Sequence, residues 1–193
     1  MSASRRTTVI RWAALAICGL AVWGCGGAPR TSATGPAGEL PDQEVTDFVI
    51  TETDQGRPQW TLYARDAAMY DARNLVVARG VRVDFFDEKG ARSSELKADQ
   101  GELNQQTRDM TARGHVVMST AEGSRMTTEV LHFDNQTQKL HSDKLVRVER
   151  DGNVLTGTGF EGDQDLHHFE FKSQVQATVR SRSGAIIETR GKK

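Results

Sequence analysis

The sequence predicts an all-β protein in which antiparallel strands repeat along one elongated sheet, and three observations support this prediction. After Val45, apolar and polar residues alternate with a period of two, which is the pattern of half-buried strands. Short turn-forming sequences separate the alternating segments, and the segments recur at a nearly constant spacing. A sustained helical stripe of apolar residues does not occur after the N-terminal 24 residues, so a helical fold is not expected.

The alternating segments place apolar residues on one face of each expected strand. They are Trp60-Leu62-Ala64, Val81-Val83-Phe85, Val116-Met118, Val146-Val148 and Val175-Ala177-Val179. Turn sequences lie at 87–90 (DEKG), 121–123 (AEG), 134–137 (DNQT) and 151–153 (DGN). Glycine supplies positive φ in such turns, and Asn and Asp side chains hydrogen-bond to the nearby backbone. Proline does not occur after Pro58, as expected of strands whose backbone N–H groups are all needed for pairing.

The repeat has a period of about thirty residues. Val81, Val116, Val146 and Val175 are separated by 35, 30 and 29 residues. A second set of landmarks, Ala64, Ala98, Thr128 and Gly157, is separated by 34, 30 and 29 residues. One such unit cannot bury its own apolar face, so neighbouring units must stack into a continuous sheet.

The first 24 residues differ from the rest and predict an export signal. Arg5, Arg6 and Arg11 precede an uncharged run over 12–24, which is the pattern of a secretory signal peptide. This run would rise about 20 Å as a helix, whereas a membrane span needs roughly 20 residues. Cys25 follows Val22-Trp23-Gly24, which resembles a bacterial lipobox, so we expect lipid attachment at Cys25. An uncleaved signal anchor and plain secretion are the alternatives.

The mature chain is expected to have two parts. Residues 25–43 are rich in Gly, Pro, Ser and Thr and predict a flexible tether, because such a composition buries little apolar surface. Residues 44–190 are expected to form the β domain. Removal of Cys18 with the signal and lipidation of Cys25 would leave no thiol for a disulfide.

Composition and motifs argue against nucleic-acid binding and catalysis. The chain has 25 Lys and Arg against 26 Asp and Glu, whereas nucleic-acid binding needs a basic excess. A Gly-x-Ser-x-Gly nucleophile motif is absent from the sequence. His115, His132 and His141 fall on separate expected strands without a ligand spacing, and His167 and His168 would face opposite sides of a strand. We therefore expect no enzyme activity, no metal and no cofactor.

Two glycine- or acid-rich segments have simple structural interpretations. Glu161, Asp163 and Asp165 lack the longer ligand series of a calcium loop, which favours a solvated turn. The segment 157–162 (GTGFEG) lacks the lysine and the following helix of a phosphate-binding loop. It therefore predicts a strand with a bulge or a close backbone approach.

Several longer motifs resemble the LptC family, the periplasmic lipopolysaccharide-export component that works beside an inner-membrane ABC transporter. They are GRPQWTLYARDAAMY from Gly56 to Tyr70, LKADQGELN from Leu96 to Asn104, and TTEVLHFD from Thr127 to Asp134. The resemblance covers about Val45 to Val179. It implies a folded-over, open β-jellyroll whose apolar interior cradles the acyl chains of lipid A.

The resemblance also implies partners and site residues. Lipopolysaccharide would arrive from the ABC transporter subunits at the N-terminal edge and leave to a soluble bridge protein that adds a strand at the C-terminal edge. The candidates for the lipid groove are Trp60, Leu62, Val83, Phe85, Leu103, Met118, Phe133, Val148, Phe160, Phe169 and Phe171. The candidates for the partner edge are Val175, Ala177 and Val179.

The apparent lipobox stands where the LptC family has a transmembrane helix, so we expect a periplasmic protein held by a lipid anchor. The inner membrane is favoured as the membrane that holds the anchor, and the outer membrane is the alternative. Two other functions are alternatives to lipopolysaccharide transport. A scaffolding lipoprotein would have a solid core and bind partners by strand augmentation, whereas a carbohydrate-active β-helix enzyme would need a cluster of carboxylates that the sequence does not offer.

Overall fold

The computed structural model describes residues 39–180 and 186–190, which form a single antiparallel sheet of ten strands. The strands are β1 (Gln43–Asp54), β2 (Arg57–Tyr70), β3 (Leu75–Phe86), β4 (Arg92–Asn104), β5 (Met110–Thr120), β6 (Arg125–Asp134), β7 (Lys139–Arg150), β8 (Asn153–Asp163), β9 (Phe169–Arg180) and β10 (Ile186–Arg190). A 3₁₀ helix, η1 (Asp71–Arg73), follows β2. The all-β prediction is therefore confirmed for the described residues.

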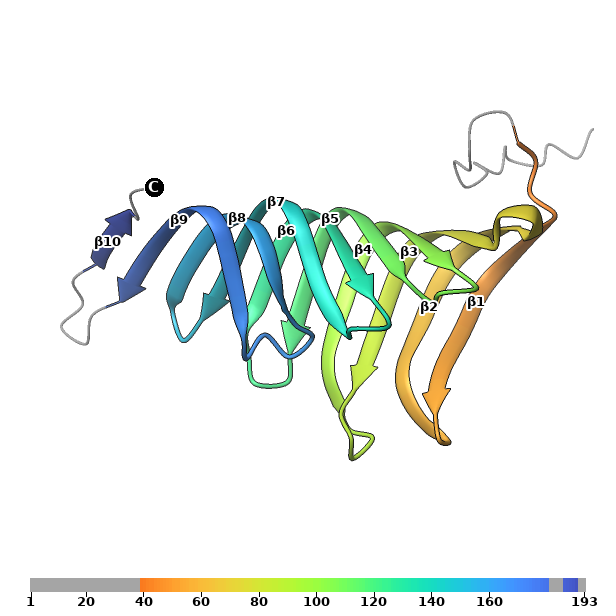
Figure 1. The fold of residues 1–193 in the computed structure, drawn as a ribbon, viewed down its shortest axis with the longest axis horizontal. Coiled ribbons are helices and arrows are strands. Elements are labelled where there is room, and N and C mark those ends of the chain that lie inside the picture. Colours follow the sequence, from red (N-terminus) through yellow and green to blue (C-terminus); the bar gives the residue numbers. More distant parts are fainter. Residues whose placement is uncertain (1–38, 181–185, 191–193) are drawn as a thin grey trace, which may run out of the picture. The chain divides into compact units, whose positions relative to one another are not determined.

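Each strand pairs with its neighbours in the chain, so the order of strands in the sheet is the order of the sequence (Figure 1). The repeat of about thirty residues corresponds to two strands. Val81, Val116 and Val146 lie on β3, β5 and β7, whereas Ala98 and Thr128 lie on β4 and β6. The four predicted turns lie at the connections between strands, although Asp134 is the last residue of β6 and Asn153 is the first residue of β8.

A row of unusual backbone conformations crosses the sheet near the middle of the strands, and we call this row the crease. Its members have positive φ within a strand: Asp47, Gly80, Gly114, His115, Gly159 and Gln174. The pairing register breaks at the same level, for example between Arg113 and Val116 of β5. Such irregularities bend a strand, and the strands curve visibly in Figure 1.

The bend folds the sheet over on itself. The rings of Phe85 on β3 and Phe133 on β6 have centroids 5.3 Å apart, although three strand spacings in a flat sheet would separate them by about 14 Å. Likewise, the indole Nε1 of Trp60 on β2 donates to Oδ1 of Asn135 in the β6–β7 turn at 3.2 Å. The two halves of the folded sheet therefore face each other.

The apolar core lies between these two halves. One cluster of buried side chains runs from β2 to β8 without interruption and includes Trp60, Val83, Met118 and Phe160. The alternation seen in the sequence supplies this face, because successive side chains of a strand point to opposite sides of the sheet.

Three expectations fall on the N-terminal part of the chain. The export signal over 1–24, the lipid-bearing Cys25 and most of the tether lie outside the described residues. Within the described part of the chain, no helix has the length and hydropathy needed to span a membrane. The first described contacts of the N-terminal segment are made by Glu39, whose Oε2 lies 3.4 Å from Nη1 of Arg73, and by Asp42, whose carboxylate accepts a hydrogen bond from the backbone N–H of Asp71 at 2.8 Å.

Candidate functional site

The structure brings the predicted groove residues together in the folded interior. Those that belong to its buried cluster are Trp60, Leu62, Val83, Phe85, Leu103, Met118, Phe133, Val148 and Phe160, each no more than 4% exposed. Phe169 and Phe171 on β9 are only partly buried and pack against this cluster. The predicted inward face is thus one continuous apolar surface.

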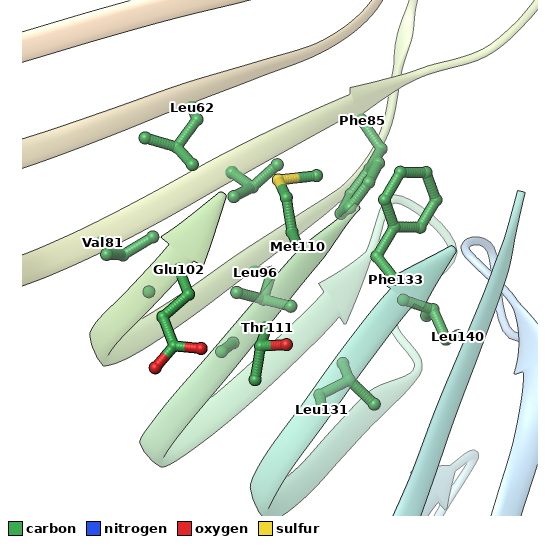
Figure 2. A pocket seen from close by; sticks show the side chains of 13 residues that line it. Leu62, Val81, Phe85, Leu96, Glu102, Met110, Thr111, Leu131, Phe133 and Leu140 are labelled. Carbon is green, nitrogen blue, oxygen red and sulfur yellow. The ribbon is translucent and has the colours of Figure 1, made fainter. Parts of the chain in front are cut away.

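The interior is closed in this structure. The apolar cavity lined by Phe85 and Phe133 has a volume of about 20 Å³, which is room for one water molecule and far less than an acyl chain. Figure 2 shows the rings of Phe85 and Phe133 beside each other among the side chains that line this cavity. The side chains that line it are almost all apolar, apart from Glu102 and Thr111. A lipid chain would therefore have to separate the two halves of the sheet.

The two halves meet along a line of turns that we call the seam: the β1–β2 and β5–β6 turns on one side, and the β4–β5, β6–β7 and β8–β9 turns on the other. Among the described residues, each strand pairs only with its neighbours in the chain, so no backbone ladder between described strands closes the seam. Side chains cross it instead. Arg108 Nε lies 3.3 Å from Glu52 Oε2, and the Trp60–Asn135 hydrogen bond lies further along.

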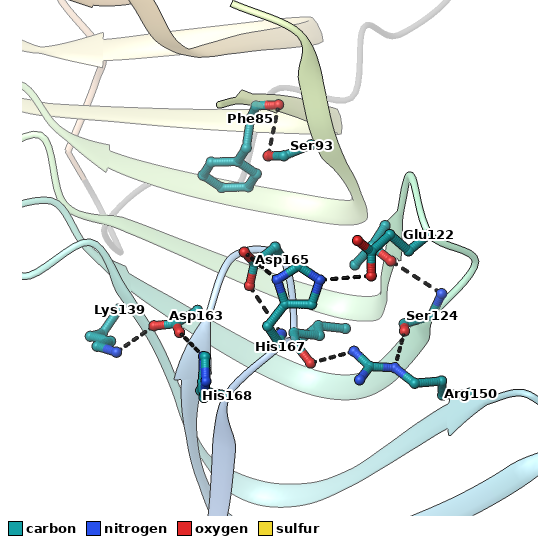
Figure 3. A network of polar contacts seen from close by, with 12 residues as sticks. Phe85, Ser93, Glu122, Ser124, Lys139, Arg150, Asp163, Asp165, His167 and His168 are labelled. Atoms are coloured by element: carbon teal, nitrogen blue, oxygen red, sulfur yellow. Dashed lines mark hydrogen bonds and ion pairs between the residues drawn. The ribbon is translucent and has the colours of Figure 1, made fainter. Parts of the chain in front are cut away.

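The C-terminal part of the seam is closed by the β8–β9 loop, residues 164–168 (Figure 3). Leu166 of this loop is fully buried in the core cluster. The guanidinium of Arg150 donates to the carbonyl oxygen of Leu166 and to the hydroxyl of Ser124, both at 2.6 Å. His167 Nε2 lies 2.6 Å from Glu122 Oε2. The loop is thereby tied to the β5–β6 turn.

The electrostatics of His167 follow from its two carboxylate neighbours. Glu122 lies at Nε2, and Asp165 Oδ2 lies 2.9 Å from Nδ1. Both ring nitrogens can donate only in the protonated imidazolium. The hydrogen bond to Glu122, followed by the negative charge of Asp165, accordingly raises the pKa of His167. The sequence interpretation missed these partners because Glu122 is 45 residues away in the chain.

Two other histidines are also placed differently from what the sequence suggested. His132 and His141 lie on separate strands, as expected, but they are cross-strand partners of β6 and β7, with stacked rings 4.8 Å apart. Burial and the neighbouring His141 lower the pKa of His132. His167 and His168 lie in a loop rather than on a strand. Groups of three or more His, Cys, Asp or Glu side chains placed to hold a metal are absent from the described residues.

The glycine-rich segment over 157–162 is part of β8, as predicted. A Cβ on Gly157 would lie 2.5 Å from Cγ of Phe171, and the pairing of β8 with β9 shifts register between Thr156 and Thr158. Both a close approach and a bulge are therefore present. Asp163 lies at the end of β8, where it forms an ion pair with Lys139.

The predicted partner edge lies on β9, but part of this strand is covered. Ala177 and Val179 pair with Thr189 and Ile187 of β10. The outermost described strand at this end is therefore β10, whereas Val175 lies beyond the segment of β9 that pairs with it. At the other end, β1 is the outermost described strand and pairs with β2.

Fold and interior together define an open β-jellyroll, a single antiparallel sheet folded over an apolar core. Comparison with protein families matches residues 12–180 to the family described as "Lipopolysaccharide-assembly, LptC-related". The chain therefore belongs to the LptC family of lipopolysaccharide-assembly proteins, which confirms the resemblance seen in the sequence.

Comparison with solved structures finds one described as "Crystal structure of LptH, the LptA homologous periplasmic component of the conserved lipopolysaccharide transport device from Pseudomonas aeruginosa". The match covers 72% of this chain and 98% of that chain, with 16% sequence identity and a TM-score of 0.49. Comparison with curated proteins gives no match.

Proposed function

We propose that this protein carries lipopolysaccharide through the periplasm by holding its acyl chains between the two halves of the folded sheet. Membership of the LptC family supports the class of cargo. The continuous buried cluster from β2 to β8 supports the place where the acyl chains lie. Each CH₂ group kept out of water contributes roughly 0.8 kcal/mol, so such an interior lowers the barrier to moving lipid through an aqueous space.

The observation that carries this proposal is the construction of the seam. It is closed by side chains such as the Trp60–Asn135 and Arg108–Glu52 pairs, and not by a backbone ladder. The halves can therefore separate while every strand keeps its neighbours. Exposed ion pairs and hydrogen bonds contribute only about 1 kcal/mol each, so acyl chains can replace them by wedging the interior open.

The transfer route is proposed from the two ends of the sheet. Lipopolysaccharide arrives from the inner-membrane ABC transporter at the N-terminal edge, where β1 is the outermost described strand and Val49 is 56% exposed. It leaves at the C-terminal end, where the sheet adds a strand of a soluble bridge protein beyond β9 and β10. A lipid on Cys25 anchors the chain to a membrane, with the inner membrane favoured.

The experiment that tests the proposal is photocrosslinking in cells. A photoreactive phenylalanine derivative replaces Phe85, Phe133 or Phe171, and the products are probed for lipopolysaccharide. Arg82 is the matched control, because it lies on the same strand as Phe85 and packs over the outer Tyr63 ring at 4.1 Å. Adducts at the three phenylalanine positions and none at Arg82 are expected. Folded, membrane-bound protein without any lipid adduct would refute the carrier function.

One observation favours a second candidate function, that of a scaffolding lipoprotein which binds partner proteins at its edges. The interior cavity beside Phe85 and Phe133 has only about 20 Å³ of free space, so the interior would serve as an ordinary core. In that case the photoprobes in the interior would give no lipid adduct, whereas probes along β1 would crosslink to protein partners.

A further inference from the structure

Leu166 differs from every other member of the interior cluster. The remaining described members lie on strands β2 to β8, whereas Leu166 comes from the β8–β9 loop. It is nevertheless 0% exposed. A leucine surrounded in sequence by Gln164, Asp165, His167 and His168 enters the core only because the loop folds it inward.

The backbone of Leu166 is held in a conformation that leucine disfavours. Its φ is +58°, in the left-handed region that residues other than glycine, Asn and Asp rarely adopt. Such a conformation persists only where its surroundings impose it. The contacts that hold the loop therefore keep the Leu166 side chain in the core. When these contacts break, the backbone of Leu166 can return to a favoured conformation.

Those contacts are polar and lie at the seam, where Gln164 Nε2 also donates to Oε1 of Gln138 at 2.8 Å. Arg150 holds the Leu166 carbonyl oxygen, and His167 holds Glu122. No carboxylate of the described residues lies within ion-pair distance of Arg150, whose hydrogen-bond partners are the neutral oxygens of Leu166 and Ser124. Water can replace each of these contacts when the loop moves away.

We propose that Leu166 is an internal plug, which occupies in the lipid-free protein a place that an acyl chain of the cargo takes. This inference rests on the proposed carrier function. The exchange replaces one aliphatic side chain by another aliphatic chain, so the apolar surroundings are conserved, and the loop gains a relaxed backbone. The β8–β9 loop swings out of the seam as the lipid enters.

Hydrogen exchange of the full chain tests whether Leu166 is a plug, because a plug and a simple cover predict opposite changes in the exchange rate. With purified lipopolysaccharide added, a peptide covering residues 163–168 is expected to exchange several-fold faster, because the N–H of Leu166 loses its bond to the Asp163 carbonyl (3.1 Å). A loop that merely covers bound lipid would exchange more slowly. Unchanged or slower exchange, in protein that crosslinks lipopolysaccharide at Phe85, would overturn the plug and leave the carrier function intact.

Variants that remove the contacts of Arg150 and His167 test the same mechanism through the rate of lipopolysaccharide uptake. Arg150→Gln and His167→Gln keep Leu166 but remove its restraints, and we expect uptake of lipopolysaccharide at Phe85 to become several-fold to about tenfold faster. The matched controls are Arg147→Gln, an exposed arginine of the same strand, and His168→Gln, the neighbouring histidine. The controls should stay within about twofold of the wild type.

Leu166→Ala removes the plug itself and should give the largest acceleration, with some loss of stability. If this variant does not fold, Arg150→Gln and His167→Gln decide the matter. Wild-type uptake rates in both would overturn the plug. A wild-type protein that shows neither crosslinks at Phe85 nor any change in exchange would refute the carrier function, and the plug with it.

Discussion

The two aromatic clusters of the interior are enclosed in different ways. In the middle, Phe85 and Phe133 come from strands three places apart, and they are 1% and 4% exposed. At the C-terminal end, Phe160, Phe169 and Phe171 come from the neighbouring strands β8 and β9, with centroids 5.7 to 5.8 Å apart. The latter two rings are only partly buried.

The difference shows that folding over, and not strand pairing, buries the interior completely. The middle cluster joins the two halves of the sheet, whereas the C-terminal cluster joins adjacent strands within one half. Strand pairing brings Phe160 opposite Phe171, but it leaves part of the rings accessible. The C-terminal end of the apolar surface is therefore less enclosed than its middle.

Truncation of one ring in each cluster gives the largest expected effect. Phe85→Ala removes a fully buried ring and should lower the free energy of unfolding by about 3–5 kcal/mol. Phe171→Ala should cost roughly 1–2 kcal/mol, because part of this ring is already in contact with water. Urea unfolding of the full chain measures both. Equal losses would show that the two clusters are equally enclosed.

A smaller effect is expected when a methyl group is added to a glycine that lies close to a neighbouring side chain, with one such glycine in each region. Gly157→Ala would place Cβ 2.5 Å from the ring of Phe171, whereas Gly101→Ala would place it 3.0 Å from Cγ2 of Val81. The ring is anchored in the sheet and cannot shift cheaply, so Gly157→Ala should cost about 1–3 kcal/mol. A thermal unfolding comparison should show a smaller loss for Gly101→Ala. A larger loss for Gly101→Ala than for Gly157→Ala would mean that β9 can move more easily than its pairing with β8 implies.

Sequence patterns predicted the strands, the turns and the inward face, because these depend on residues close in the chain. The alternation around Trp60, Phe85 and Phe133 was enough to place each side chain inside. It was not enough to show that Phe85 meets Phe133, because that contact depends on the bend at the crease. A positive φ at Asp47, His115 or Gln174 has no clear signal in the sequence.

The seam was the least predictable part of the site. Its contacts join turns that are far apart in the chain, such as Glu52 with Arg108 and Glu122 with His167. Leu166 was missed because its neighbours made the whole segment look like a solvated turn. A single leucine in an otherwise polar loop was the available signal, and it became meaningful only when the loop was seen against the core.

The smallest predicted effect is the dependence of stability on pH, which has opposite signs for His167 and His132. The folded pKa of His167 is raised by Glu122 and Asp165. Its contribution to stability is therefore complete below the unfolded pKa of about 6.5 and is lost as the pH rises through the folded value. The folded pKa of His132 is lowered by burial and by His141. Its contribution is present above about pH 6.5 and is lost as the pH falls through the folded value.

Melting temperatures measured across this pH range check the two signs. His167→Gln should flatten the decline of stability on the alkaline side, and His132→Gln should flatten the decline on the acid side. His168→Gln serves as a control beside His167. Identical pH profiles for the wild type and His167→Gln would show that the loop is not held by the imidazolium.

The crease has a consequence for how such a protein can change in size. Each two-strand unit carries its own bend at the same level, for example Gly80 on β3 and Gly114 on β5. A whole hairpin can therefore be inserted or deleted without turning any neighbouring strand's side chains to the wrong face. The distance over which the apolar surface extends is set by the number of hairpins, so evolution or design can adjust the reach of the protein in whole steps.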